Sequence, residues 1–150
     1  MSSGVTVELR SQPRLTKTIV QEGSGEFPEP GNVCEVHYHG TLKSGDVFDS
    51  TRSRGKTFKF RVGCSEVIKG WDIGVETMKV GEKAILQVPP EYGYGDHGVG
   101  PIPPKADLTF EIELVKFYDD TYSAVKWQVL GLCLFILWIL YYVNTTDRYT

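Results

Sequence analysis

Residues 107 to 114 alternate strictly between polar and apolar side chains, and this pattern limits the fold more than any other feature of the chain. Successive side chains of a strand point to opposite faces, so such a stretch has one buried face and one exposed face. The inward set is expected to be Leu108, Phe110, Ile112 and Leu114, and the outward set Asp107, Thr109, Glu111 and Glu113. This segment is therefore predicted to be a strand that covers an apolar core.

Similar signals recur earlier in the chain and predict strands near residues 5–10, 15–20, 33–39, 47–49, 58–62 and 84–88. Within the third of these, Tyr38 is expected to point inward, and His37 and His39 to point to solvent. Residues 43–46 read as a hairpin turn, and residues 22–31, 50–57 and 91–105 as loops. A long loop in a small domain is often functional.

One short helix is expected between the strands, because Ile68, Trp71, Val75 and Met78 recur at helical spacing. A helix of this length is marginal alone and must lie against the strands. The economical architecture is an α+β fold, a curved antiparallel sheet of five to six strands wrapped around one short helix. Trp71 is then either core or the floor of a pocket.

Composition excludes some classes of function. The chain has 150 residues, a formal charge of −3, 41% hydrophobic and 23% charged residues, which suits one soluble domain with a small addition. Mild acidity and the lack of a basic run argue against nucleic acid as a partner. Three scattered cysteines have no zinc spacing, and His37 and His39 alone make a poor metal site, so no metal or cofactor is expected.

The C-terminal part has a different character. Residues 127–143 form an uncharged run of seventeen residues with aromatic residues at both edges, which predicts a transmembrane helix rather than a buried core helix. The expected organisation is a domain at 1–118, a tether at 119–126, the membrane helix and a polar tail at 144–150. Such a tail anchor would keep the folded domain in the cytosol, at the endoplasmic reticulum in preference to the mitochondrial outer membrane.

Several motifs in the first 118 residues occur together in a characteristic order: VHYHG at 36–40, FDSTRSRG at 48–55, FKF at 58–60, EVIKGW at 66–71, YGYG at 92–95, IPP at 102–104 and LTFEIEL at 108–114. With these motifs, the chain from Val5 to Tyr118 resembles the FKBP peptidyl-prolyl isomerases, the macrolide-binding immunophilins. The loop at 95–103 looks one residue shorter than in the small members of that family.

This resemblance implies a pocket between the sheet and the helix. Its catalytic residues would be Tyr38, Asp49, Phe58, Trp71, Tyr94 and Phe110, and its substrate- or macrolide-binding residues Phe48, Arg54, Glu66, Val67, Ile68 and Ile102. By the same resemblance, the Ile68 N–H and the Tyr94 hydroxyl would hold ligand carbonyls, Asp49 would be held by Tyr38 and Arg54, and Trp71 would lie under the prolyl ring. From the residues alone, Asp49 and Arg54 could equally be an exposed ion pair.

The implied partners are X-Pro-containing proteins or peptides, macrolides such as rapamycin, and the membrane. Rotation about an X-Pro bond breaks amide resonance and needs no covalent step. A dry apolar site favours the twisted amide, which has less charge separation than the planar one. A membrane-tethered binding module or co-chaperone, using the pocket or its rim with little catalysis, is the alternative interpretation.

Overall fold

The computed structural model describes residues 4–120, 132 and 135–136. Backbone contacts divide the chain into two compact units, Met1–Tyr118 and Asp119–Thr150. The first unit holds every named strand and helix, in the order β1 Val5–Ser11, β2 Arg14–Gln21, β3 Val33–Leu42, β4 Val47–Ser50, β5 Phe58–Arg61, α1 Lys69–Glu76, β6 Lys83–Val88, the short 3-10 helix η1 Pro90–Tyr92 and β7 Leu108–Tyr118.

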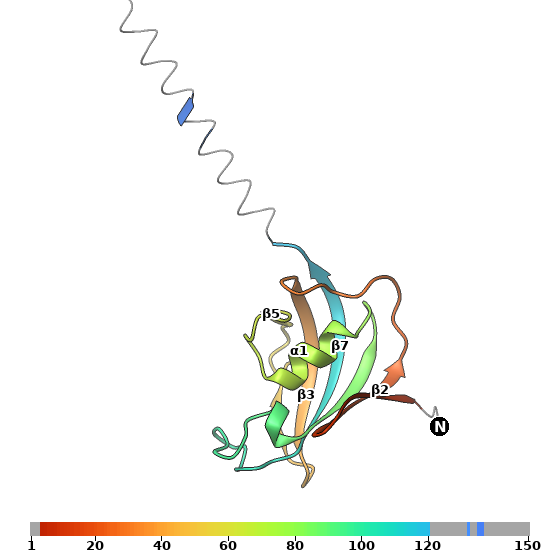
Figure 1. Ribbon diagram of the computed structural model, residues 1–150, viewed down its shortest axis with the longest axis vertical. Helices are drawn as coiled ribbons and strands as arrows, with labels where there is room; N and C mark the ends of the chain where they lie inside the picture. The colour runs from red at the N-terminus through yellow and green to blue at the C-terminus, as the bar shows by residue number, and fades with distance from the viewer. Residues whose placement is uncertain (1–3, 121–131, 133–134, 137–150) are drawn as a thin grey trace, which may run out of the picture. The chain divides into compact units, whose positions relative to one another are not determined.

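The strands make one antiparallel sheet of seven strands within the described residues, so the prediction of five to six strands is too low. Their order is β1-β2-β6-β7-β3-β4, and β5 pairs with β3 beside β4. Both short strands β4 and β5, predicted near residues 47–49 and 58–62, pair with the same edge of β3. Figure 1 shows the sheet curving around α1, with β3 and β7 behind the helix.

The helix α1 is shorter than the predicted span of 68–78. It begins after Ile68, whose ψ of 149° is extended, and it ends at Thr77. The Thr77 hydroxyl donates to the carbonyl oxygen of Gly74 at 2.7 Å, which tightens the last turn. Gly70 and Gly74 face the sheet, where a Cβ would lie 2.7 Å from Val88 Cγ1 and 2.5 Å from Leu86 Cδ1 respectively. Glycine at these two positions lets the helix approach β6 closely.

The core lies between α1 and the concave face of the sheet. The predicted inward residues of β7 are all buried there, as are Cys34, Val36 and Tyr38 of β3. The first strand differs, because Val5 and Val7 are 61% and 40% exposed while Leu9 packs against the core. The apolar face of β1 is therefore only partly covered.

The outer face of β3 does not point to solvent as predicted. His37 and His39 are half-buried because the end of β4 and the segment after it fold over them, and their Nδ1 atoms lie 3.2 Å from the hydroxyls of Thr51 and Ser50 respectively. Glu35 on the same face is only 7% exposed. It is covered by its ion pairs with Lys59 at 3.1 Å and Lys116 at 3.3 Å.

The predicted membrane helix, with its tether and polar tail, falls almost wholly outside the described residues. Among the residues that are described, no helix is long and apolar enough to span a bilayer. Leu132, Phe135 and Ile136 are described, and they are helical and 48–62% exposed.

Candidate active site

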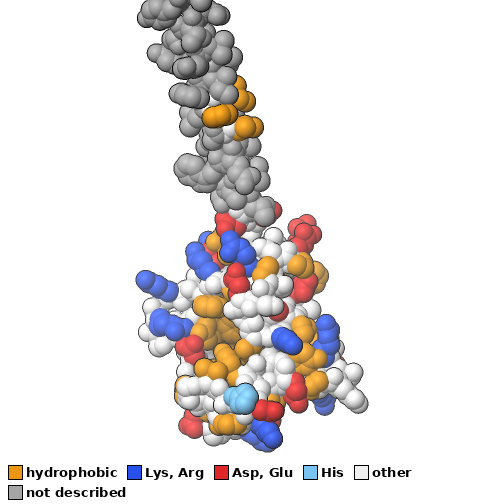
Figure 2. All heavy atoms as spheres, turned by 60° about the vertical axis from the view of Figure 1, so that its left-hand side comes forward, with side chains coloured by type: hydrophobic (Ala, Val, Ile, Leu, Met, Phe, Trp, Pro, Cys, Tyr) orange, Lys and Arg blue, Asp and Glu red, His pale blue; other side chains and the backbone are white. Residues whose placement is uncertain are grey.

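A cavity of about 230 Å³ opens between α1 and the sheet. Figure 2 is turned so that the β5 side comes forward, and it shows hydrophobic side chains gathered in a hollow on this face. Strands β3, β4, β5 and β7, the turn into α1 and the loop after η1 all contribute to the cavity. The lining residues are Tyr38, Phe48, Asp49, Phe58, Glu66, Val67, Ile68, Trp71, Tyr94 and Phe110.

Trp71, in the first turn of α1, is the floor of this cavity and is 4% exposed. Its ring meets Tyr38 edge-on at 4.9 Å between centroids and Phe110 edge-on at 5.3 Å. Phe58 contacts it at 6.0 Å. Edge-to-face packing of this kind fixes ring positions as well as burying apolar area. Trp71 was predicted to be either a core residue or the floor of a pocket. It is both, because one side of its ring packs in the core and the other side lines the cavity.

The apolar wall of the cavity depends on Gly40, a residue that sequence reasoning did not single out as part of the site. Phe48 packs edge-on against Phe110, with 5.5 Å between ring centroids. Both rings lie over Gly40, where a Cβ would lie 2.6 Å from Phe48 Cζ and 3.1 Å from Phe110 Cε1. A glycine inside a strand pattern often marks a close approach of another chain segment. The glycine at position 40 is thus the sequence signal that could have predicted this contact.

Polar groups gather on the rim beside Tyr38. The Tyr38 hydroxyl donates a short hydrogen bond to Asp49 Oδ2, and it accepts one from Arg54 Nη2 at 2.8 Å. Arg54 Nη1 lies 3.3 Å from Asp49 Oδ1. Burial, together with the hydrogen bond to Asp49, raises the pKa of the Tyr38 hydroxyl, so the phenol stays protonated as a donor at neutral pH. The Asp49–Arg54 ion pair is therefore part of a three-residue network at the cavity.

Thr51 supports this network through the backbone of Tyr38, and it was not predicted from the sequence as a site residue. It is 1% exposed, and its hydroxyl accepts a hydrogen bond from the Tyr38 N–H at 2.9 Å. The Thr51 N–H donates to the Tyr38 carbonyl oxygen at 3.0 Å. The segment after β4, which reads as a polar surface flap in the sequence, is thereby tied to β3.

Two further donors face the opening. Tyr94 is 39% exposed, and burial of its hydroxyl, with the nearby Asp49 charge, raises its pKa. Ile68 is the N-cap of α1, so its N–H lies before the helical hydrogen-bond pattern. The turn ahead of it is held by Glu66, whose Oε2 accepts the Arg61 N–H at 2.8 Å.

Ten of the twelve residues proposed from the sequence line this one cavity. Arg54 does not line it and reaches it through Tyr38 and Asp49. Ile102 does not line it either. Its side chain is 7% exposed and packs in the core, while its backbone pairs with Val99 through two hydrogen bonds of 2.9 and 3.0 Å.

This arrangement is an apolar cavity with a few fixed donors and an acceptor at its mouth. No serine, threonine, cysteine or lysine is among the residues that line it, so it suits a reaction that needs desolvation and orientation of an amide without covalent chemistry. A curved sheet around a short helix, with such a cavity between them, is the arrangement expected for the class of prolyl isomerases that the sequence resembles.

Comparison with known proteins identifies the family. A sequence profile of the FKBP-type peptidyl-prolyl cis-trans isomerases matches residues 24–115. The FK506-binding protein 1 of Dictyostelium discoideum is 52% identical over 101 residues, covering 67% of this chain and 94% of that protein. A peptidyl-prolyl cis-trans isomerase of Schizosaccharomyces pombe is 45% identical over 107 residues, covering 70% and 96%.

A solved structure agrees with these relatives. The crystal structure of AtFKBP13 matches with a TM-score of 0.65 at 40% sequence identity, covering 68% of this chain and 91% of that one. The chain belongs to the FKBP-type peptidyl-prolyl cis-trans isomerase family, and its enzyme activity is the cis-trans isomerisation of X-Pro bonds.

Proposed function

We propose that the Trp71 cavity is the isomerase site, that it also binds macrolides of the FK506 and rapamycin type, and that it acts on proteins at a membrane surface. One observation carries the first part: residues from four strands and α1 converge on one mostly apolar cavity with the Trp71 ring as its floor. The names of the relatives, FK506-binding proteins 1 and 2, support the macrolide part.

In this proposal, a prolyl ring lies on Trp71 between Phe58 and Phe110. The Ile68 N–H and the Tyr94 hydroxyl orient the flanking carbonyl groups. Removal of water raises the energy of the planar amide relative to the twisted amide, whose carbonyl carries less negative charge. The network of Tyr38, Asp49 and Arg54 keeps the rim acceptor in place and gives it one orientation. No residue of the cavity has to take up or release a proton.

The experiment is cis-trans exchange of an X-Pro peptide catalysed by the full chain, with and without rapamycin. The expected result is exchange that the drug abolishes at one equivalent. Catalysis that continues with bound rapamycin would place the reaction outside this cavity. Drug binding without catalysis would favour the membrane-tethered binding module instead.

The membrane part of the proposal rests on residues 127–143 and on the exposed apolar side chains of Leu132, Phe135 and Ile136. The domain would face the cytosol, at the endoplasmic reticulum in preference to the mitochondrial outer membrane. The test is flotation of the full chain with lipid vesicles. Leu134→Lys with Ile139→Lys should abolish flotation, because each lysine near the centre of a membrane helix costs about 3 kcal/mol. Flotation of that double variant would contradict the anchor.

A further inference from the structure

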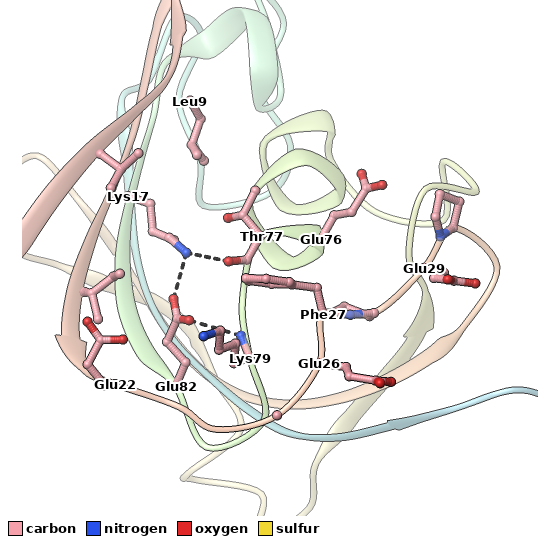
Figure 3. Close-up of a pocket in the computed structure, with 15 residues that line it drawn as sticks. Leu9, Lys17, Glu22, Glu26, Phe27, Glu29, Glu76, Thr77, Lys79 and Glu82 are labelled. Atoms are coloured by element: carbon pink, nitrogen blue, oxygen red, sulfur yellow. Dashed lines mark hydrogen bonds and ion pairs between the residues drawn. The ribbon is translucent and has the colours of Figure 1, made fainter.

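A second concavity lies elsewhere on the domain and shares no residue with the isomerase cavity. It is an open groove of about 1080 Å³ between the β1–β2 hairpin, the loop of residues 22–30, the C-terminal end of α1 and the start of β6. Figure 3 shows Phe27 and the end of α1 on one side of this groove, and Leu9 and Lys17 on the other. We call it the hairpin groove.

The walls of the hairpin groove are apolar and incompletely covered. Val7 is 40% exposed and Phe27 is 51% exposed, and Leu9 and Ile19 are half-buried beside them. These side chains come from β1, β2 and the following loop, so the apolar surface is continuous across three segments. A contiguous exposed apolar surface with a polar edge is typical of an interaction site.

The charges around the hairpin groove are unbalanced. Four carboxylates border it, and none of them forms an ion pair with any residue in the described part of the chain: Glu22, Glu26, Glu29 and Glu76. Figure 3 shows Glu26 and Glu29 on the loop beside Phe27 with their carboxylates turned outward. The cation at this rim is Lys79, whose Nζ lies over the Phe27 ring at 5.4 Å from its centroid.

The floor of the hairpin groove carries a buried ion pair. Lys17 is 4% exposed, and its Nζ donates to Glu82 Oε1 at 2.8 Å and to the Thr77 carbonyl oxygen at 2.7 Å. The lysine and glutamate charges therefore compensate each other on the floor, which leaves the uncompensated charge of the groove on the glutamates at its rim.

From these observations we infer that the hairpin groove is a docking site for a cationic amphipathic segment of a partner protein. The apolar side chains of that segment would pack on Phe27, Val7 and Leu9. Its lysine or arginine side chains would pair with the glutamates at the rim. Complementary charge around an apolar centre sets specificity and association rate in such interfaces.

The test is binding of a short synthetic peptide of leucine and lysine, patterned as an amphipathic helix, to the full chain in non-ionic detergent. Fluorescence anisotropy of the labelled peptide is expected to give a Kd in the micromolar range. Glu22→Lys with Glu26→Lys should weaken binding roughly tenfold or more, because two favourable charge pairs become unfavourable. Phe27→Ser should weaken it by roughly fivefold or more through lost apolar contact. X-Pro isomerisation by these variants should be unchanged, which shows that they are folded.

The matched control is Glu91→Lys with Asp107→Lys, which makes the same change in net charge outside the hairpin groove. It should alter the Kd less than twofold. An equal loss of binding in this control would show a non-specific charge effect and overturn the inference. Equal binding of the same peptide with glutamate in place of lysine, or displacement of the peptide by rapamycin, would overturn it as well.

Discussion

Gly40 on β3 and Phe48 on β4 approach so closely that a Cβ on Gly40 would lie 2.6 Å from Phe48 Cζ. The two strands pair here, with Gly40 opposite Asp49. The missing side chain of Gly40 thus sets where the Phe48 ring stands, and the ring in turn forms a wall of the isomerase cavity. A backbone position outside the cavity lining therefore controls the shape of the cavity.

Gly40→Ala is expected to lower kcat/KM for X-Pro isomerisation about tenfold. The added methyl group must push the Phe48 ring away, and overpacking of this kind typically costs about 1–3 kcal/mol. Peptide exchange kinetics on the full chain measure the effect. The double variant Gly40→Ala with Phe48→Leu should recover most of the activity, because leucine leaves room for the methyl group. An undiminished rate in the single variant would mean that the ring position does not matter.

Asp49→Ala and Tyr38→Phe are each expected to lower kcat/KM by roughly tenfold to a hundredfold or slightly more. Each removes one partner of the same hydrogen bond, and a hydrogen bond to a charged group contributes about 1.5–3 kcal/mol. The double variant should therefore be little worse than the worse single variant. A double-mutant cycle on kcat/KM tests this coupling. Strictly multiplicative losses would show that the two residues act independently.

Gly74→Ala is expected to destabilise the domain by about 1–3 kcal/mol, although alanine is ordinarily better than glycine inside a helix by about 1 kcal/mol. The reason is that a Cβ at this position would lie 2.5 Å from Leu86 Cδ1. Chemical unfolding gives the free energy difference. Leu86→Ala removes the obstructing methyl groups. In a Leu86→Ala background, Gly74→Ala should therefore cause no further loss of stability. A stabilised single variant would contradict the close contact between α1 and β6.

Lys17→Met is expected to destabilise the domain by about 3–5 kcal/mol, because it leaves the buried carboxylate of Glu82 without its cation. Glu82 has a second function, since its Oε2 accepts the Lys79 N–H at 3.0 Å. The double variant Lys17→Met with Glu82→Leu should be more stable than Lys17→Met alone, because no uncompensated charge is then buried. Urea unfolding of the two variants and the original chain measures the difference. A double variant less stable than the single one would show that the Lys79 N–H bond outweighs the ion pair.

Glu35 is expected to make stability fall in acid. Its hydrogen bond with Lys59, followed by the contacts with Thr57 and Lys116, holds its pKa below the ordinary value of 4.5. A lowered pKa in the folded state means that the stabilisation is complete above that ordinary value and is lost as pH falls through the folded pKa. The difference in unfolding free energy between the original chain and Glu35→Gln should therefore shrink with acidification. Lys59→Met should reduce this pH dependence. If the difference in unfolding free energy between the original chain and Glu35→Gln stays constant in acid, the prediction is wrong.

Much of the domain could be predicted from local pattern. Alternation in β7 and β3 placed their buried residues correctly, because a strand with one covered face repeats every two residues. The helical spacing around Trp71 placed the helix correctly but made it too long at both ends. Capping geometry at Ile68 and Thr77 decides where a helix begins and ends, and the spacing of apolar residues does not contain it.

Other features were decided by strands that are distant in sequence. Alternation assigned Glu35, His37 and His39 to the outer face of β3, but it could not show that the segment after β4 and two lysines cover that face. The family resemblance named Ile102 as a pocket residue; its side chain packs in the same core cluster as Trp71 and Phe110, and it is not among the residues that line the cavity. The hairpin groove was not expected at all, because it needs β1, the loop of residues 22–30 and the end of α1 at one place.

By itself, then, the sequence determined the periodic strands, the single helix and the set of aromatic residues that belong together. The tertiary structure alone decided which strands pair, which outward side chains are covered and where the two concavities lie. The physical reason is that side-chain direction within an element follows from backbone geometry over a few residues. Burial of a side chain depends instead on chain segments that lie far away in the sequence.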